Sequence, residues 1–205
     1  IVLFLNIIAQ LDIYYGVRPD LQELSICATA SVADWALDQG YAVGLYSNTT
    51  LFIPDEDLPV HTSQEENNQE KILTARSKRR RIRLPATSNG EQRQRIMETL
   101  ARVQPFLSSP IEEILQSERT HLSAGATIVI VTSTISEQLI DVLNSIRRSG
   151  HSVTILFAAD TPPPLKLGTI TTYHLGGETT WKELLSAYTN KDDQAPLFYK
   201  PGFRL

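Results

Sequence analysis

Two kinds of segment alternate along this chain, and they differ in the spacing of their apolar residues. Short apolar runs rich in β-branched residues, such as 1–8 (IVLFLNII) and 126–132 (ATIVIVT), predict strands that are buried on both faces of a sheet. Between them, apolar residues recur every three or four positions, which predicts helices with one buried face. This alternation indicates an α/β fold with a doubly wound, mostly parallel sheet and helices on both faces.

Further signals place the remaining elements. Pro19 and Asp20 open the first helix, with Asp20 and Glu23 as a capping box, and Gly40 ends it. The strand that follows completes a right-handed βαβ unit with the first strand. We expect additional strands at 41–46, 51–53, 81–85 (an edge strand that ends at Pro85), 151–158 and 169–174, and additional helices near 88–103, 110–118, 135–148 and 179–188.

The starts of the later helices are predicted from their capping residues. Ser88 with Glu91 forms a second capping box, and the apolar spacing of that helix continues to Val103. Pro110 suits the first position of the next helix, because proline has no N–H to leave unpaired there. Thr180 is one candidate cap for the last helix.

The length of 205 residues suits a single domain, which we place at 1–189. Within it, 49–80 is expected to be a long loop and edge-strand excursion, since 54–71 is acidic, rich in amides and poor in large apolar residues. The segment 190–205 lacks periodicity and is expected to be a C-terminal tail. The start at Ile1, directly in a buried strand, suggests a trimmed chain whose preceding part would not be visible.

Charge and cysteine content narrow the classes of function. The net charge of −4 argues against a dedicated nucleic-acid-binding domain, which is usually strongly basic. Cys27 is the single cysteine, so it cannot form an internal disulfide, and this fits a reducing compartment. No apolar run approaches the roughly 20 residues that a membrane-spanning helix needs.

Polar residues follow three of the predicted strands, at the place where doubly wound sheets bind ligands. They carry amides and hydroxyls, whereas a hard divalent cation also needs anionic oxygen ligands. We therefore predict no metal site and interpret this crevice as a candidate surface for binding another protein. Its expected residues are Asn6, Gln10, Ser47, Asn48, Thr49, Thr50, Thr132, Ser133 and Thr134.

Three stretches resemble the bacterial family known as DUF58. They are a helix of small residues that leads into 38–48 (DQGYAVGLYSN), the strand RIRLP before a helix that ends LARV, and 146–157 (IRRSGHSVTILF). That family resembles the von Willebrand factor A domain, which often binds Mg²⁺ through a D-x-S-x-S loop, a threonine and a second aspartate. Here 6–10 (NIIAQ) would occupy the first loop without any Asp or Ser of the motif, and Ser133 stands near the place of the second aspartate.

The resemblance implies a non-catalytic protein–protein interaction module with a degenerate metal site. It also implies the cytoplasmic domain of a membrane-anchored bacterial protein. As a partner, it implies a MoxR-type AAA+ ATPase, with a role in the assembly or maturation of complexes.

A basic segment supports an alternative function, the binding of nucleic acid or another anionic surface. The simpler interpretation is a solvated edge strand whose charges prevent edge-to-edge pairing and offset the acidic loop before it. We favour the simpler one, because no aromatic residues interleave the charges for stacking on bases. The residues concerned are Arg76, Lys78, Arg79, Arg80, Arg81 and Arg83.

The residue types that often carry catalysis are scattered. Cys27 lies inside the first helix and is expected to be a small core residue, and neither Ser47 nor Ser133 lies in a G-x-S-x-G motif. No phosphate-binding glycine motif follows a strand. We predict no enzymatic activity and no cofactor, with a hydrolase of unrecognised site as the third interpretation. The four histidines, His61, His121, His151 and His174, lie on separate segments without metal-ligand spacing.

Overall fold

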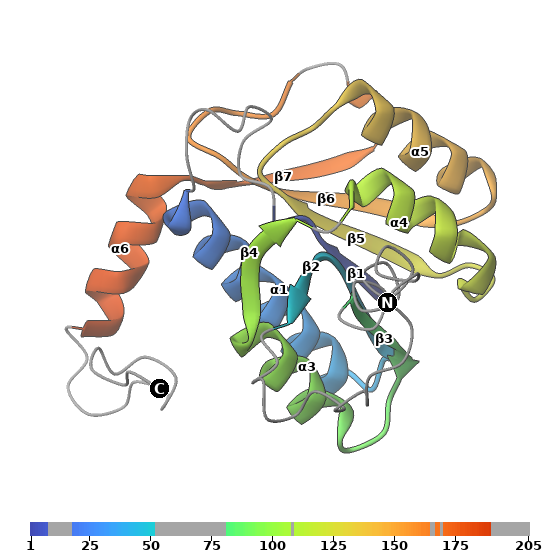
Figure 1. Ribbon diagram of the computed structural model, residues 1–205, viewed down its shortest axis with the longest axis horizontal. Coiled ribbons are helices and arrows are strands. Elements are labelled where there is room, and N and C mark those ends of the chain that lie inside the picture. Colours follow the sequence, from blue (N-terminus) through green and yellow to red (C-terminus); the bar gives the residue numbers. More distant parts are fainter. Residues whose placement is uncertain (8–17, 52–80, 108, 165–166, 169, 190–205) are drawn as a thin grey trace, which may run out of the picture.

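One mixed sheet organises the chain in the computed structural model, which describes residues 1–7, 18–51, 81–107, 109–164, 167–168 and 170–189 (Figure 1). The strands are β1 (Val2–Leu5), β2 (Val43–Leu51), β3 (Arg81–Thr87), β4 (Val103–Leu107), β5 (Thr127–Thr132), β6 (Ser152–Ala158) and β7 (Thr171–Gly176). The helices are α1 (Pro19–Asp38), α3 (Gln92–Ala101), α4 (Ile111–Glu118), a 3₁₀ turn η3 (Arg119–His121), α5 (Glu137–Arg148) and α6 (Glu178–Thr189).

The strands follow the order β3-β2-β1-β5-β6-β7, and β4 pairs with β2 beside this path. Strands β1, β2, β5, β6 and β7 are parallel to one another, whereas β3 and β4 are antiparallel to β2. The chain winds from β1 to β2 on one side and later resumes at β5 on the other, which is the order of a doubly wound sheet. The predicted α/β fold with a mostly parallel sheet and helices on both faces is confirmed.

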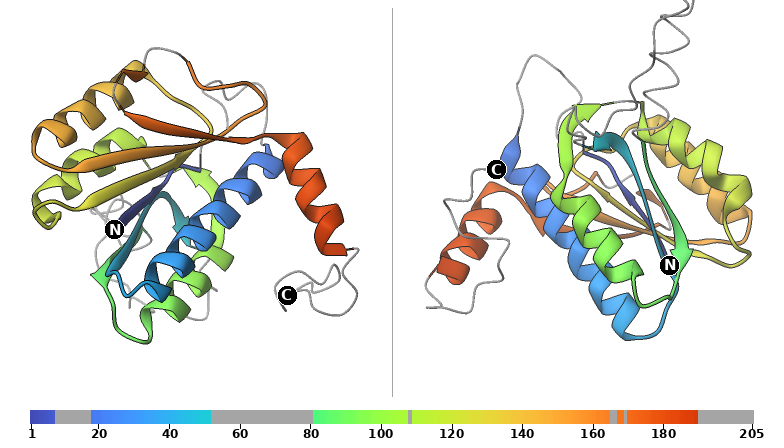
Figure 2. Two further views of the ribbon diagram at one scale, coloured as in Figure 1. Left: turned by 180° about the vertical axis from the view of Figure 1, so that it is seen from behind. Right: turned by 60° about the horizontal axis from the view of Figure 1, so that its bottom comes forward.

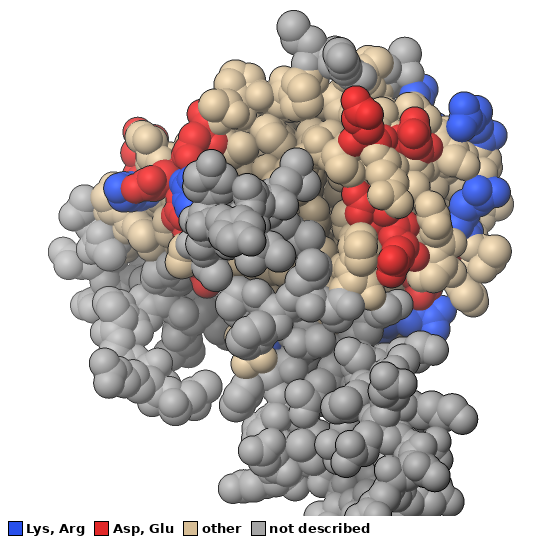
Figure 3. All heavy atoms as spheres, turned by 45° about the horizontal axis from the view of Figure 1, so that its top comes forward, with Lys and Arg blue, Asp and Glu red and all other residues tan. Residues whose placement is uncertain are grey.

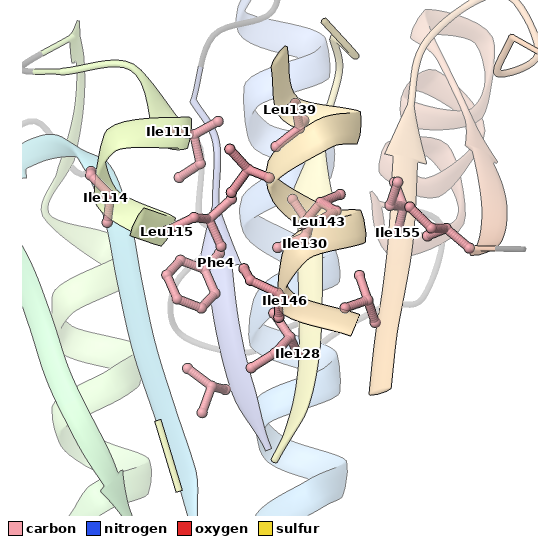
Figure 4. Close-up of a cluster of buried hydrophobic side chains, with 14 of the residues drawn as sticks. Phe4, Ile111, Ile114, Leu115, Ile128, Ile130, Leu139, Leu143, Ile146 and Ile155 are labelled. Carbon is pink, nitrogen blue, oxygen red and sulfur yellow. The ribbon is translucent and has the colours of Figure 1, made fainter. Parts of the chain in front are cut away.

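The core forms two layers because successive side chains of a strand point to opposite faces of the sheet. Val2 and Phe4 pack with α4 and α5, and Leu3 and Leu5 pack with α1 and α3. Figure 4 shows the first layer, where Phe4 lies below Leu115 and beside Ile146. Figure 2 shows α1 and α3 together on the opposite face.

Helix α6 does not belong to either layer. It projects beyond the sheet beside the start of α1 (Figures 1 and 2). Trp181 of α6, which is 8% exposed, packs with Leu24 of α1 and Ala158 of β6 in a third, much smaller cluster.

Strand β2 is longer than predicted. Residues 47–51, expected in the crevice loop and the excursion, continue this strand from Val43 to Leu51. The reason is β4, which pairs Leu107 with Thr49 and Val103 with Leu51. The sequence placed Val103 in a helix that in fact ends at Ala101, so this assignment is wrong. Pairing with β2 decides the conformation here and overrides the local helical spacing.

Strand β3 lies at one end of the sheet path, as predicted, but it does not end at Pro85. It continues to Thr87, because an edge strand has one side on which a proline nitrogen needs no partner. Opposite, a Cβ on Gly44 would lie 2.9 Å from the backbone N of Ala86 and 3.0 Å from the backbone O of Leu84. The close approach of β2 and β3 therefore requires glycine at position 44.

Three predicted helix caps are wrong. Asp20 lies inside the first turn of α1 and pairs with Arg18, so it is not a capping-box residue. Helix α3 begins only at Gln92, and Ser88 makes no capping hydrogen bond to it. Thr180 lies inside α6, whose first N–H, on Glu178, binds the carboxylate of Asp160 instead.

Other boundaries shift by a few residues. Pro110 precedes the first helical residue of α4, and the predicted strand at 169–174 is β7, two residues later. Helix α5 has a cap that was not predicted, since the hydroxyl of Ser136 accepts from the N–H of Leu139 at 3.0 Å. The predictions for residue 8, 52–80 and 190–205 lie outside the described residues. In the part of the chain that is described, no helix is long and apolar enough to cross a membrane.

Candidate functional site

Three polar side chains form one row across the sheet, at the carboxyl ends of β1 and β5 and at the adjacent position within β2. Leu5 pairs with Ser47 and with Val131, and the N–H of Asn6 binds the carbonyl of Val131 at 2.9 Å. The next position of each strand is therefore Asn48, Asn6 and Thr132. All three lie on the face of α4 and α5, two residues after core residues of that face. We call them the Asn6–Asn48–Thr132 row.

The row is buried, with Asn6 3% exposed and Asn48 and Thr132 fully covered. Its hydrogen bonds run in one direction. The backbone N–H of Ile7 donates to Oδ1 of Asn48 at 2.9 Å, and Nδ2 of Asn48 donates to Oδ1 of Asn6 at 2.7 Å. Nδ2 of Asn6 then donates to Oγ1 of Thr132 at 3.0 Å, and this hydroxyl donates to the carbonyl of Thr134 at 2.7 Å.

The two backbone groups at the ends determine this direction. An N–H can only donate and a carbonyl can only accept, so Asn48 must turn its oxygen toward Ile7 and Thr132 must give its proton to Thr134. The Thr132 hydroxyl also accepts from the N–H of Thr134 at 3.2 Å. With one donated and two accepted hydrogen bonds, this hydroxyl uses its full capacity.

These residues do not fit a hard divalent cation. The row holds two amides and a hydroxyl, none of which carries the negative charge that offsets the dehydration of such an ion. The oxygens that could approach a cation already accept hydrogen bonds within the row. Among the described residues, no group of three or more histidine, cysteine or acidic side chains is arranged to hold a metal ion.

Other predicted crevice residues lie elsewhere. Ser47 and Thr49 are fully covered and belong to β2, not to a loop at its end. The Ser47 hydroxyl donates to the carbonyl of Leu5 at 2.7 Å, and the Thr49 hydroxyl donates to the carbonyl of Gln104 in β4. Both therefore join strands. Gln10 lies outside the described residues, and the side chain of Thr50 is not described.

The loop after β5 forms the accessible rim of the site. Ser133 is 8% exposed, and Thr134 and Ser136 are partly exposed. The Ser136 hydroxyl donates to a carboxylate oxygen of Glu112 at 2.5 Å and so joins the starts of α4 and α5. Acidic side chains gather over these two helices (Figure 3). The sequence does not predict Glu112 as a residue of the site, because nothing local shows that α4 begins at this edge.

The basic segment contributes one described side chain, that of Arg83. Its Nε and Nη2 donate to Glu118 of α4 at 3.0 and 2.9 Å, and Glu118 is 7% exposed. Arg83 therefore joins the edge strand β3 to α4. The side chains of Arg76, Lys78, Arg79, Arg80 and Arg81 lie outside the described residues.

A second polar cluster lies at the carboxyl ends of β1 and β6. Nη2 of Arg18 lies 2.6 Å from Asp20, 2.9 Å from Asp160 and 3.7 Å from Glu178. We call these four residues the Arg18 junction. The N–H of Glu178 and the Arg18 guanidinium lower the pKa of Asp160, and Arg18 lowers the pKa of Asp20. No local pattern in the sequence predicts this junction, since 142 positions separate Arg18 from Asp160.

The thiol and imidazole groups stay apart from both clusters. Cys27 is half-buried against the Leu24–Trp181 contact, and burial raises the pKa of its thiol, which disfavours the nucleophilic thiolate. Nε2 of His174 donates to the carbonyl of Ala159 at 2.7 Å, since a carbonyl can only accept. His121 lies 3.6 Å from Glu118. His61 lies outside the described residues.

Searches for known protein families and for similar curated proteins gave no match to this chain.

Proposed function

We propose that this chain is a protein–protein interaction module of the von Willebrand factor A type, in which a closed hydrogen-bonded row replaces the metal site. The strand order and the antiparallel edge strand β3 support this proposal, since they agree with a doubly wound sheet. The resemblance to DUF58 supports the same assignment. A cytoplasmic location in a membrane-anchored bacterial protein is part of the proposal.

The main observation behind this proposal is the Asn6–Asn48–Thr132 row. It occupies the position where ligands bind to doubly wound sheets, yet it is neutral, buried and bonded to itself. It therefore keeps the ends of three strands in register and offers no charge to a metal-bridged ligand. Recognition then depends on the surrounding loops at the same edge, 133–138 and 160–164.

The proposed partner is a MoxR-type AAA+ ATPase, and the test is a pull-down with such ATPases in the ATP-bound, ADP-bound and nucleotide-free states. Glu137→Arg reverses an exposed charge at the start of α5, on the binding edge. Arg148→Glu is the matched control, because it reverses an exposed charge at the opposite end of the same helix. We expect Glu137→Arg to abolish recovery of the ATPase and Arg148→Glu to preserve it. Failure to recover an ATPase in every nucleotide state would contradict the proposed partner.

Calorimetry with Mg²⁺ and Mn²⁺ tests the closed row separately. We expect no binding heat and no change in ATPase recovery when a chelator is added, because recognition does not pass through a cation. Saturable binding of either ion, lost in Asn6→Ala, would overturn the interpretation of the row.

A further inference from the structure

We infer that α6 is a releasable arm, held on the domain by the Arg18 junction and detached when that junction is broken while the sheet stays folded. This inference goes beyond the proposed function, because it concerns α6, and its test does not depend on a partner.

The apolar anchor of α6 is small. Among the described side chains of α6, Trp181 is the one that is buried; it packs on Leu24 and Ala158, and the partly buried Leu185 packs against the same cluster. Leu184 and Tyr188, further along the helix, are 38% and 52% exposed. In Figures 1 and 2 the helix points away from the sheet, so that its removal would uncover neither of the two main core layers.

The hydrogen bonds that hold the start of α6 meet at the carboxylate of Asp160. Oδ1 of Asp160 accepts from the N–H of Glu178 at 2.8 Å, while Oδ2 accepts from Arg18 at 2.9 Å. Arg18 itself is held by Asp20 at the start of α1, through two hydrogen bonds of 3.0 and 2.6 Å. The first turn of α6 is therefore connected to α1 through Asp160 and a single guanidinium group.

Two glycines connect α6 to the sheet. Gly176 has a φ of +86°, which side-chain-bearing residues rarely adopt. A Cβ on Gly177 would lie 2.1 Å from Oδ1 of Asp160, so the carboxylate reaches the helix start only because position 177 is glycine. The two glycines therefore allow Asp160 to bind the first turn of α6. Once that hydrogen bond is broken, they allow the connection to adopt other backbone conformations.

These contacts make release a local event. Ion pairs between partly exposed groups contribute little each and weaken as salt screens them. Segments held by few buried apolar contacts open at a lower free energy than the core of the same domain. Salt and loss of the Arg18 charge should therefore free α6 before they affect β5 and β6, which lie in the middle of the sheet.

Hydrogen exchange of the whole chain, read by mass spectrometry, tests this inference. In Arg18→Gln we expect amides of α6 to exchange about tenfold faster or more, with β5 and β6 unchanged. Raising NaCl from about 0.05 to about 0.5 M should move the unsubstituted protein in the same direction. Arg93→Gln is the matched control, because Arg93 of α3 pairs with Asp34 and Asp38 of α1. This variant should leave exchange in α6 unchanged.

A second readout uses the fluorescence of Trp181 in a Trp35→Phe background, since Trp35 is already 56% exposed. Acrylamide should quench Trp181 about twofold more strongly once Asp160→Asn or Arg18→Gln is added. Asp160→Asn keeps an oxygen for the N–H of Glu178, but it removes the charge and replaces the oxygen that accepts from Arg18 by an amide NH2 group. Unchanged exchange in α6, unchanged quenching, or acceleration of β5 and β6 to the same extent as α6 would each overturn the inference.

Discussion

The Asn6–Asn48–Thr132 row and the Arg18 junction lie at the same edge of the sheet, yet they join strands and helices by opposite means. The row is neutral and almost fully covered, and each of its members both donates and accepts hydrogen bonds. The junction is charged and partly exposed, with the side chain of Asp160 49% exposed. The row and the junction differ in charge because they differ in burial. Removing a charge from water costs far more free energy than removing a paired amide.

This edge of the sheet is therefore expected to be rigid at the row and able to change conformation at the junction. Loss of one amide in the row leaves its buried partners without a hydrogen bond, and water cannot reach them to replace it. The free energy of unfolding of the whole domain therefore falls. Loss of one charge in the junction leaves partners that water can reach, so the effect stays small and local. Variants of the row should therefore lower the stability of the domain more than variants of the junction do.

Asn6→Asp should have the largest effect. The new carboxylate replaces the Nδ2 that donates to Thr132, and it places a negative charge among covered neutral groups. We expect a loss of about 4 kcal/mol in the free energy of unfolding at neutral pH, measured by urea denaturation.

The pH dependence of that variant has a definite sign. Burial favours the protonated acid, so its pKa is raised on folding. Stability is then retained below the ordinary aspartate pKa of about 3.9 and lost as the pH rises through the raised value. Asn144→Asp, at a half-buried position on α5, is the control and should lack this loss. Equal stability of the two variants at neutral pH would show that the row tolerates charge.

Asn48→Ala should come next. It removes the acceptor of the Ile7 N–H and the donor to Asn6, and both partners remain buried. We expect the free energy of unfolding to fall by about 3 kcal/mol, at about 1–3 kcal/mol for each unsatisfied group. Asn144→Ala should change it by less than about 0.5 kcal/mol. A loss in Asn48→Ala below about 1 kcal/mol would mean that the row adds little to stability.

Gly177→Ala probes the junction without changing any charge. Its Cβ would meet both Oδ1 and the backbone N of Asp160, at 2.1 and 2.6 Å, so either Asp160 or α6 must move. We expect increased quenching of Trp181 and a fall of about 1 kcal/mol in stability, as for a lost helix cap. Gly90→Ala is the control, since no atom lies within 4 Å of its Cβ. Full protection of Trp181 in Gly177→Ala would show that α6 is held by other contacts.

Acid should give the smallest and most selective effect. Because the pKa values of Asp160 and Asp20 are lowered in the folded protein, their contribution is complete above about 3.9 and is lost as the pH falls through the lowered values. The other charged groups that face the start of α6 are Arg18, Glu178 and Lys182, which pairs with Glu178. We expect Trp181 quenching to increase as the pH falls from about 4 to about 2, before far-ultraviolet circular dichroism changes. Simultaneous loss of both signals would remove the contrast between row and junction.

Several elements can be predicted from the sequence because their signal is local and strong. Runs dominated by apolar residues identified β1, β5 and β6, because the burial of most of their positions leaves little room for charged side chains. The helical spacing of Leu139, Leu143 and Ile146 identified α5 for a similar reason. Polar residues at the strand ends also identified Asn6 and Thr132 as residues of the candidate site.

The roles of those residues depend on contacts between segments that are far apart in the sequence. β4 and the extension of β2 form because each pairs with the other, which no local pattern reveals. The register of β1 with its two neighbours turns three scattered polar residues into one directed chain of hydrogen bonds. The Arg18 junction joins residues from opposite ends of the chain. Local sequence records which groups a segment can offer, whereas long-range packing decides which partners they meet and whether water reaches them.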